Sequence, residues 1–399
     1  MQLVAYGAQD VYLTGNPKVT FFQAVYKRHT NFAMETIEQT VNGTAANSGR
    51  VSVTVARNGD LVGEMFVEVK PNTLNKDSAW VAHRVISDVE LSIGGQRMDK
   101  HYQKWWAFYY NLWLDADKRI SWGQMTSSPS GGYSVYLPLI FFFNRNPGLY
   151  LPLIALQYHE VRLDFDLSSE FEAITDESTF KVWANYVYLD TEERRRFAQG
   201  AHEYLIEQVQ HTGEFGVTAG QTTNVRLTYN HPVKQLVWGF QNADAYANVK
   251  QFNFTSATTL EGSVNVQNST CPLPFGTPIL DAIAFGGCDE EVTGPLSTFK
   301  LILNGQDRFK EQSGKYFNQV QPFYHCNGPA LPGIYSYSFA LKPCEHQPTG
   351  TCNFSRIDNA QAAITIKPGF TYNTTLSMFA VNYNVLRIQS GMGGLAFSN

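Results

Sequence analysis

The chain has 399 residues, of which 43% are hydrophobic, 14% aromatic and only 16% charged. This length suits two domains, and so few charges indicate either large cores under a neutral surface or apolar surface that partner subunits cover. The net charge of −5 excludes a protein whose main task is to bind a phosphate backbone, so we expect no direct contact with nucleic acid.

The N-terminal segment has no basic region followed by a long apolar stretch, so we expect no cleaved secretory signal. Residues 7–17 are rich in turn formers, residues 21–26 are mostly apolar, and residues 27–29 are basic. This pattern predicts either an ordinary first strand with its turn or an arm that contacts neighbouring proteins. The longest apolar stretch, residues 137–143, is far shorter than the roughly 20 residues of a membrane span, so we expect no membrane insertion.

Short strands are predicted in both halves of the chain, because apolar and polar residues alternate there and the runs end at turn-forming residues. One run ends at Gly94-Gly95. The alternation is found at residues 51–55, 66–70, 89–93, 161–167 and 225–229. Many short strands of this kind predict a sandwich or a barrel.

Helical patterns are sparse. Residues 100–117 contain Trp105, Trp106 and Trp113, and we expect a helical excursion between strands there. Residues 191–208 form the most charged stretch of the chain and predict a short helix or an ordered linker at a domain boundary. Its basic run directly follows two glutamates, which favours ion pairs over a nucleic-acid patch.

An internal repeat connects the two halves. Residues 89–96 resemble residues 299–306, since both are alternating strands that end in a Gly-Gly-Gln or Asn-Gly-Gln turn. The strand that begins at Val161 resembles the one around Ile364, and Asn185-Tyr186 resembles Asn382-Tyr383. These matches occur in the same order with offsets of roughly 200 residues, which indicates a duplicated domain rather than chance similarity between strand patterns. We therefore predict two domains, residues 1–200, including an N-terminal arm, and residues 201–399.

No catalytic motif occurs: the sequence contains no GxSxG, HExxH, P-loop or GxGxxG pattern. The nine histidines are scattered, whereas the metal site of an enzyme needs clustered ligands. His159 and Glu160 are adjacent, and adjacent residues of a strand point to opposite faces, so they cannot chelate together. We predict no enzyme activity, no catalytic or metal-binding residues and no cofactor.

All five cysteines lie in the second half and form no CxxC pair, so we expect reduced thiols. A cross-link between Cys344 and Cys352 is the alternative.

Five Asn-x-Ser/Thr sequons are candidate N-glycosylation sites: Asn42, Asn253, Asn268, Asn353 and Asn373. Asn253 and Asn268 lie in the part of the second half richest in predicted loops, residues 242–298, and are the better candidates.

Many segments resemble the major capsid proteins of nucleocytoplasmic large DNA viruses, most closely those of the chloroviruses that infect algae. The resemblance spans nearly the whole chain and is weakest at residues 242–298. The segments that carry it are residues 3–17, 20–22, 26–33, 93–102, 137–143, 147–161, 303–309, 350–359 and 383–388.

The resemblance implies an all-β double jelly roll, in which two tandem eight-stranded jelly-roll sandwiches carry short helical excursions in their loops. It implies a structural protein that forms a homotrimeric, pseudo-hexagonal capsomer of an icosahedral capsid, since three copies of two similar domains give six similar units. Expected partners are other copies, neighbouring capsomers and minor capsid proteins under the shell, which the N-terminal segment contacts. The expected location is the virion, after assembly in the host cytoplasm.

The resemblance also implies covalent glycans on asparagines outside the usual sequons, which leaves the role of the five sequons open. Two alternatives to the bulk capsomer remain at this point. One is a minor capsid paralogue used at special positions. The other is a jelly-roll carbohydrate-binding module for host attachment, because exposed aromatic rings on a β-sandwich stack on sugars.

Overall fold

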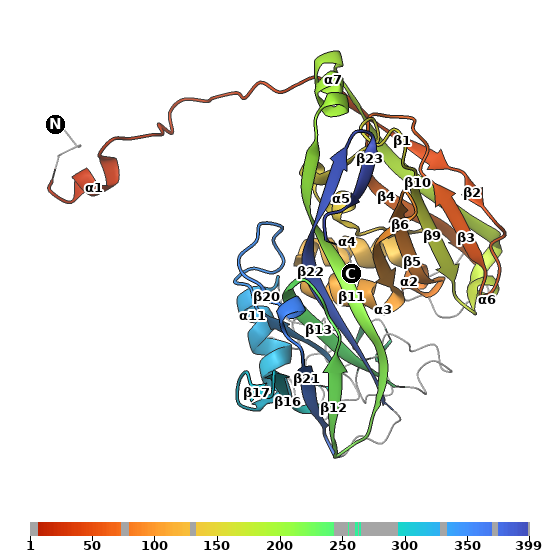
Figure 1. The fold of residues 1–399 in the computed structure, drawn as a ribbon, viewed down its shortest axis with the longest axis vertical. Helices are drawn as coiled ribbons and strands as arrows, with labels where there is room; N and C mark the ends of the chain where they lie inside the picture. The colour runs from red at the N-terminus through yellow and green to blue at the C-terminus, as the bar shows by residue number, and fades with distance from the viewer. Residues whose placement is uncertain are drawn as a thin grey trace.

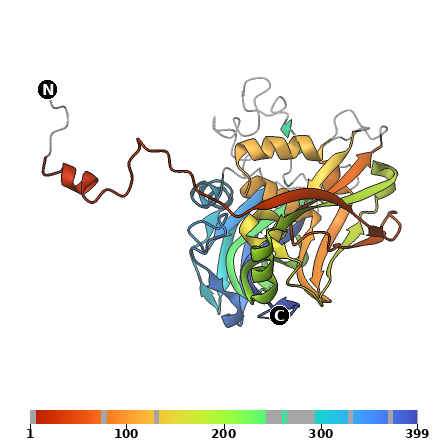
Figure 2. The ribbon, with the colours of Figure 1, turned by 90° about the horizontal axis from the view of Figure 1, so that it is seen from above.

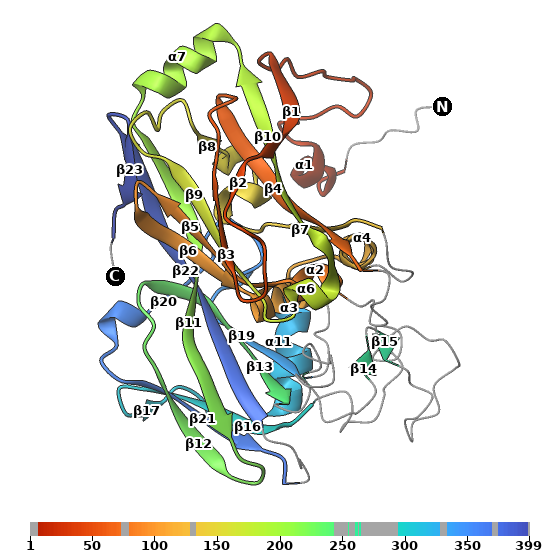
Figure 3. The same cartoon turned by 90° about the vertical axis from the view of Figure 1, so that its right-hand side faces the viewer.

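The computed structural model describes residues 7–72, 80–127, 133–242, 254, 260–261, 263–264, 294–327, 333–368 and 374–397. These residues form two β-sandwiches, which we call the N roll (residues 32–189) and the C roll (residues 202–395), joined by α7 (Thr191–Gln199). Figures 1 and 3 place the N roll above most of the C roll, with α7 at the top.

The N roll consists of antiparallel strands in two sheets. The first sheet has the order β1 (Phe32–Gln39), β10 (Thr175–Leu189), β4 (Leu61–Pro71), β7 (Val135–Pro138), and β8 (Leu151–Pro152) also pairs with β4. The second sheet has the order β2 (Val41–Asn42), β3 (Arg50–Thr54), β9 (Val161–Leu167), β5 (Ile86–Ile93), β6 (Gln96–Tyr102).

The C roll repeats this plan. Its first sheet has the order β11 (His202–Val217), β22 (Thr374–Gln389), β13 (Pro232–Asn242), β19 (Ile334–Ser338), with β20 (Cys352–Asn353) on β13 and β23 (Met392–Leu395) on β22. Its second sheet has the order β12 (Thr222–Leu227), β21 (Ala360–Ile366), β16 (Leu296–Leu303), β17 (Gln306–Asp307), and β18 (Gln312–Ser313) also pairs with β16. A separate hairpin joins β14 (Leu260–Glu261) and β15 (Ser263–Val264).

The principal strands follow the same order in the two rolls, with β2 and β23 as additions to one roll each, which confirms the predicted double jelly roll and its internal repeat. The matched turns show this most clearly: φ is 59° and 81° at Gly94 and Gly95, and 52° and 77° at Asn304 and Gly305. Positive φ at both central residues is typical of a two-residue type I′ hairpin, and glycine and asparagine adopt it most readily. The repeated turn in the sequence therefore encodes the same hairpin twice.

The helices are short and lie in the connections between strands, as expected. They are α1 (Asp10–Thr14), α2 (Val81–Arg84), α3 (Gln103–Leu112), α4 (Ala116–Thr126), α5 (Phe142–Arg145), η1 (Pro147–Leu149), α6 (Phe171–Ile174), η3 (Tyr316–Val320), α11 (Gln321–His325) and η4 (Phe354–Arg356). Among the described residues no helix is both long and apolar enough to cross a bilayer.

Three predicted boundaries were wrong. The helix expected at residues 100–117 begins only at Gln103, because the preceding residues belong to β6, and it ends at Leu112 before a separate helix. The segment 191–208 is helical only to Gln199, and its remainder is the start of β11. Most of the loop region predicted at residues 242–298 lies outside the described residues, but β16 already begins at Leu296.

The core explains why the two rolls adhere to each other. In β22, the side chains of Leu376, Met378 and Ala380 pack in the C-roll core, while the intervening Phe379 and Val381 belong to the N-roll core. Successive side chains of a strand point to opposite faces, so the first sheet of the C roll is buried on both sides. The N-roll core therefore extends onto the outer face of the C-roll first sheet, while the C-roll interior forms a second cluster on the other face.

Candidate functional site

The junction between the two rolls is the most extensively buried contact of the described chain outside the two sandwiches. Helix α3 lies across the outer face of the C-roll first sheet, and the Trp105 and Phe108 rings lie 5.7 and 5.5 Å from the ring of Phe379. Gly239 permits this approach, because a Cβ atom there would lie 2.9 Å from the Phe108 ring. The junction is thus a packed interface and not a loose linker.

Hydrogen bonds fix the register of this junction. The backbone N–H of Val209 donates to Asp99 Oδ1 at 3.0 Å, which joins β11 to β6. On the other side of α3, Asn327 donates its backbone N–H to the Leu112 carbonyl at 3.2 Å and its side-chain amide to the Trp113 carbonyl at 2.7 Å. Both contacts satisfy polar backbone groups that the packing removes from water.

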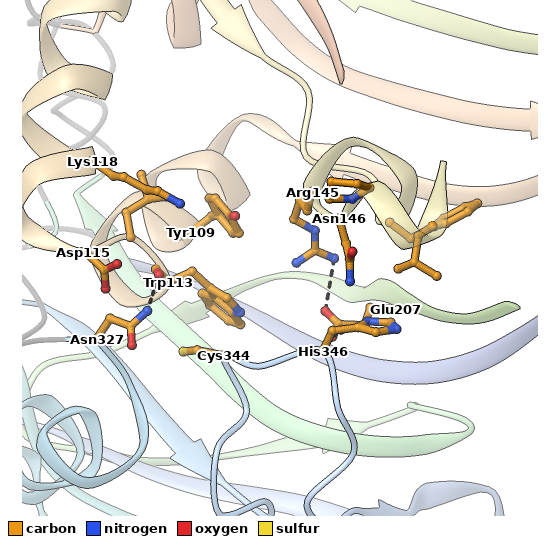
Figure 4. Close-up of a pocket in the computed structure, with 14 residues that line it drawn as sticks. Tyr109, Trp113, Asp115, Lys118, Arg145, Asn146, Glu207, Asn327, Cys344 and His346 are labelled. Carbon is orange, nitrogen blue, oxygen red and sulfur yellow. Dashed lines mark hydrogen bonds and ion pairs between the residues drawn. The ribbon is translucent and has the colours of Figure 1, made fainter. Parts of the chain in front are cut away.

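A buried charge cluster lies in the same junction (Figure 4). Glu207 on β11 accepts hydrogen bonds from Arg145 of the N roll at 3.1 Å and from Lys234 on β13 at 2.5 Å, and His346 lies 3.6 Å away. The side chains of Lys234 and Glu207 are only 0% and 4% exposed. This charge cluster ties one strand of the C roll to α5 of the N roll.

The protonation state of Glu207 follows from its partners. Burial by itself raises the pKa of Glu207, but attraction to Arg145 and Lys234, together with its hydrogen bonds, outweighs burial and lowers the pKa to about 2. Burial lowers the pKa of Lys234, and attraction to Glu207 offsets part of that effect. Glu207 is therefore ionised at neutral pH and serves as the anion that makes the buried cations tolerable.

A cavity of about 300 Å³ adjoins the cluster and is lined by both rolls, including Trp113, Asp115, Lys118 and Cys344. Its one buried carboxylate, Glu207, is held by cations and so is not available as a general base. The described residues contain no group of three or more His, Cys, Asp or Glu side chains that could hold a metal ion. The charge cluster around Glu207 therefore has a structural role, which is to hold the two rolls in one orientation.

The structure places two of the predicted glycosylation sites and not the other three. Asn42 is exposed on β2, and Asn353 is exposed on β20, where its side chain accepts a hydrogen bond from the backbone N–H of Ser355 at 3.1 Å. Asn253, Asn268 and Asn373 lie outside the described residues. The two described sites lie on different rolls and form no common site.

We expected His159 and Glu160 to lie on a strand, and this was wrong. Both residues lie in the connection before β9. His159 Nδ1 lies 2.9 Å from the carbonyl oxygen of Gly393 and 3.1 Å from the backbone nitrogen of Gly393. This contact joins the N roll to β23 of the C roll, so the side chain has a structural position at the second end of the junction.

The predicted alternative of a Cys344–Cys352 cross-link is wrong, because both residues are free thiols. Cys344 lines the junction cavity and its thiol donates to the Leu112 carbonyl at 3.4 Å, whereas Cys352 lies on β20. The nearer thiol is that of Cys326, which is hydrogen-bonded to Cys344. Cys326 is likewise free.

The N-terminal arm, residues 7–31, extends away from both rolls (Figures 1 and 2). The prediction of an ordinary first strand at residues 21–26 was wrong, since β1 begins only at Phe32. The arm carries large apolar side chains that are almost fully exposed, among them Tyr12, Phe21, Phe22 at 99%, and Tyr26. Exposed apolar side chains gathered in one segment indicate a surface for a partner.

Sequence reasoning missed the buried charge cluster. Glu207 lay in a segment read as helix or linker, where a charged residue raises no question. Lys234 offered the better signal, because it stands between Val233 and Gln235 inside a strand that is otherwise mostly apolar. A lysine buried in a central strand needs a counter-ion, and that requirement points to a carboxylate on the same face of the sheet.

Two family models match the chain and together span most of it. Residues 20–190 match the N-terminus of a major capsid protein, and residues 193–394 match the large eukaryotic DNA virus major capsid protein. The chain is 44% identical over 440 residues to the major capsid protein of Paramecium bursaria Chlorella virus 1, covering 100% of this chain and 99% of that relative. It is 38% identical over 517 residues to the major capsid protein of Phaeocystis pouchetii virus, with the same coverage.

Solved structures agree with these matches. The subunit in a quasi-atomic model of the PBCV-1 virus capsid is 40% identical and superposes with a TM-score of 0.78, covering 95% of this chain and 100% of that one. The Faustovirus major capsid protein is only 12% identical but superposes with a TM-score of 0.72, covering 96% and 94% of the two chains. The second likeness supports the fold alone.

Proposed function

The chain belongs to the family of large eukaryotic DNA virus major capsid proteins, and from this premise we propose that three copies of it form a pseudo-hexagonal capsomer. Such capsomers tile the facets of an icosahedral virus shell. The chain is a structural protein of the virion and not an enzyme.

The observation that carries the proposal is the matching order of the principal strands in the two rolls. Three chains with two equivalent rolls each give a ring of six similar units around a threefold axis. A unit with a nearly hexagonal outline covers a flat facet without gaps. The rigid junction around Glu207 matters here, because a capsomer keeps its outline only when the two rolls of each chain keep their orientation.

The N-terminal arm supports a second part of the proposal, that the arm contacts neighbouring capsomers or minor capsid proteins under the shell. Its exposed aromatic side chains suit an apolar groove on a partner. Deleting residues 1–30 should leave the capsomer intact and abolish the recruitment of minor proteins to assembled particles. Unchanged assembly with the full set of minor proteins would contradict this role.

Glycans and the place of assembly complete the proposal. We propose that capsids assemble in the host cytoplasm and that exposed asparagines carry covalent glycans, for which Asn42 and Asn353 are accessible. The intact mass of virion protein should exceed 44.8 kDa if glycans are present. Peptide mapping then locates them, and an unmodified mass excludes them.

The experiment that tests the capsomer is a solution mass measurement by light scattering on the purified full-length chain. A mass near three times 44.8 kDa, with hexagonal particles in negative-stain micrographs, is the expected result. A chain that stays monomeric at high concentration would contradict the capsomer. It would favour a minor capsid component or a carbohydrate-binding module instead.

A further inference from the structure

Two cysteines meet where the C roll contacts the end of α3. Cys326 directly follows α11, and Cys344 lies in the connection between β19 and β20. Cys344 Sγ lies 3.4 Å from the carbonyl oxygen of Leu112, and the backbone N–H of Asn327 donates to the same oxygen at 3.2 Å. The two thiols are hydrogen-bonded to each other. A single carbonyl group thus brings both cysteines to the same point, and we call Cys326 and Cys344 the dithiol.

A buried cation lies beside the dithiol. Arg119 is only 5% exposed, and its guanidinium donates hydrogen bonds to the carbonyl oxygens of Asn111, Leu114 and Asn327 at 2.8, 2.9 and 3.3 Å. Among the residues that the structure describes, Arg119 forms no ion pair with a carboxylate. Buried charges in proteins are normally paired. A thiolate at Cys326, directly before Asn327, supplies the negative charge that this cation lacks.

The surroundings make the two thiols unequal. Gln235 Nε2 donates a hydrogen bond to Cys326 Sγ at 3.3 Å. The hydrogen bond with Cys344 is the largest effect on the pKa of Cys326 and lowers it. Burial raises this pKa, whereas the hydrogen bonds with Gln235 and Ser336 and the attraction to Arg119 lower it, and the net direction is downward. Hydrogen bonding to Cys326 and burial raise the pKa of Cys344. Cys326 is therefore the thiol that ionises first, while Cys344 keeps its proton.

Small molecules reach the dithiol. Both side chains are partly exposed. Cys344 lines the junction cavity of about 300 Å³, where Figure 4 shows it beside Trp113 and Asn327. A water molecule takes about 30 Å³ in the liquid, so a molecule of the size of hydrogen peroxide enters this space. An accessible thiolate next to a second thiol is the arrangement of a cysteine that oxidants attack.

We propose that the dithiol is a redox site, in which a peroxide oxidises Cys326 and Cys344 to a disulfide. The Cys326 thiolate attacks one oxygen of the peroxide, the O–O bond breaks, and a sulfenic acid forms while hydroxide leaves. The Cys344 sulfur then attacks the sulfur of the sulfenic acid, the S–S bond forms, and the hydroxyl group leaves with the Cys344 proton as water. Two electrons pass from the sulfur atoms to hydrogen peroxide, which ends as two molecules of water.

The disulfide fastens the end of α11 to the connection before β20. Oxidation removes the thiol proton of Cys344, but the carbonyl group of Leu112 keeps the N–H of Asn327, so it does not lose its last partner. The contact of the C roll with the end of α3 is therefore retained. The closed loop contains β19, and such a closure stabilises a fold mainly by restricting the unfolded chain.

The timing of the oxidation rests on the proposed function. A chain that assembles in the reducing host cytoplasm keeps the dithiol reduced during assembly, and release of the virion exposes it to oxidants. Virions from the medium should therefore carry the disulfide, and particles from cells lysed in N-ethylmaleimide should carry two alkylated thiols. The same state in both preparations would overturn the timing.

The first test treats the reduced full-length chain with an equimolar amount of hydrogen peroxide. The remaining thiols are then alkylated, and peptides are mapped by mass spectrometry without reduction. Cys326 and Cys344 should form one linked pair that has lost two hydrogens. Cys352 is the internal control, because it lies on β20 and burial raises its pKa, and it should be recovered alkylated. The melting temperature should rise by on the order of 5 °C on oxidation and return with dithiothreitol.

The second test separates the roles of the two thiols. In Cys344→Ser the sulfenic acid has no second thiol to react with, so dimedone should label Cys326 after peroxide treatment. In Cys326→Ser dimedone should label Cys344 about 10-fold more slowly, since it is mainly the thiolate that reacts. The matched control, Cys352→Ser, should form the disulfide and show the same rise in melting temperature as the wild type.

The wild-type chain alone decides the proposal if a serine variant fails to fold. Recovery of Cys326 and Cys344 as two alkylated thiols, or oxidation of the pair no faster than that of Cys352, would overturn the redox site. These measurements do not depend on the number of chains in the particle. A chain that forms the disulfide but stays monomeric would support the redox site and contradict the capsomer.

Discussion

Replacing Glu207 with Gln tests whether the buried charge cluster holds the two rolls together. The substitution keeps the size of the side chain and removes its charge, so Arg145 and Lys234 lose their anion in a junction from which water is excluded. Removing one partner of a buried ion pair typically costs about 3–5 kcal/mol. The lowering of the Glu207 pKa from 4.5 to about 2 corresponds to about 3 kcal/mol at 1.36 kcal/mol per unit, which agrees.

The same strand provides a matched control. Glu203 lies four residues earlier on β11 and pairs with Arg387 at 2.8 Å, but the two side chains are 59% and 56% exposed. Glu203→Gln should therefore lower the free energy of unfolding by no more than about 1 kcal/mol. Urea unfolding followed by tryptophan fluorescence measures both variants. A loss for Glu207→Gln as small as that for Glu203→Gln would refute the reasoning.

Acid titration of the wild-type chain examines the same group by a different route. Because folding lowers the pKa of Glu207, its stabilising contribution is complete above about pH 4.5 and is lost as the pH falls towards 2. The burial that lowers the pKa of Lys234 acts in the opposite sense, so the cluster as a whole contributes less than Glu207 alone. In Glu207→Gln the stability should lose this part of its dependence on pH between 4.5 and 2.

Three further predictions use the same unfolding measurement. Gly305→Ala should cost about 1–2 kcal/mol, because φ is 77° there and no neighbouring atom would touch the new methyl group, so strain is the only cause. Gly63→Ala should lower the free energy of unfolding by about 1–3 kcal/mol through overpacking, since its Cβ would lie 2.6 Å from the Tyr150 ring. Gly216→Ala is the control: it has open space around it and should change the free energy of unfolding by less than about 1 kcal/mol. Burial lowers the pKa of His83 from 6.5 to about 3. The free energy of unfolding should therefore fall as the pH drops below 6.5, by at most about 1.4 kcal/mol per pH unit, and His83→Gln should remove that slope. An unchanged slope in His83→Gln, or equal losses for Gly63→Ala and Gly216→Ala, would contradict these assignments.

The sequence predicts the fold well where local geometry dictates it. Alternating residues such as Val89, Leu91 and Ile93 place one face of β5 in the core, and all three are fully buried. The Gly94-Gly95 and Asn304-Gly305 turns indicate a duplicated hairpin because few residues tolerate positive φ twice in succession. These signals depend on neighbours in the chain, and they need no knowledge of the tertiary structure.

Contacts between distant segments could not be predicted in this way. Glu207 and Arg145 lie on different rolls, and nothing in either local sequence specifies their partner. The apolar residues of the arm were compatible with a strand. The structure shows instead that Phe21 and Phe22 are exposed and pair with none of the described strands. The requirement for an anion near Lys234 was readable in principle, but not the identity of that anion.

The equivalent strands β10 and β22 differ in what covers their outward faces. In β22 the outward side chains include Phe379 and Val381, which the N roll buries, whereas the outward side chains of β10 include Lys181 and Trp183, which are partly exposed. A permanent contact inside one chain tolerates a fully apolar face, because that face never meets water after folding. The corresponding face of the N roll combines aromatic rings with charged groups such as Glu68, which accepts a hydrogen bond from Trp183 at 2.8 Å. The duplicated fold thus carries one sheet whose outer face is buried on folding and an equivalent sheet whose outer face keeps charged and partly exposed side chains in the single chain.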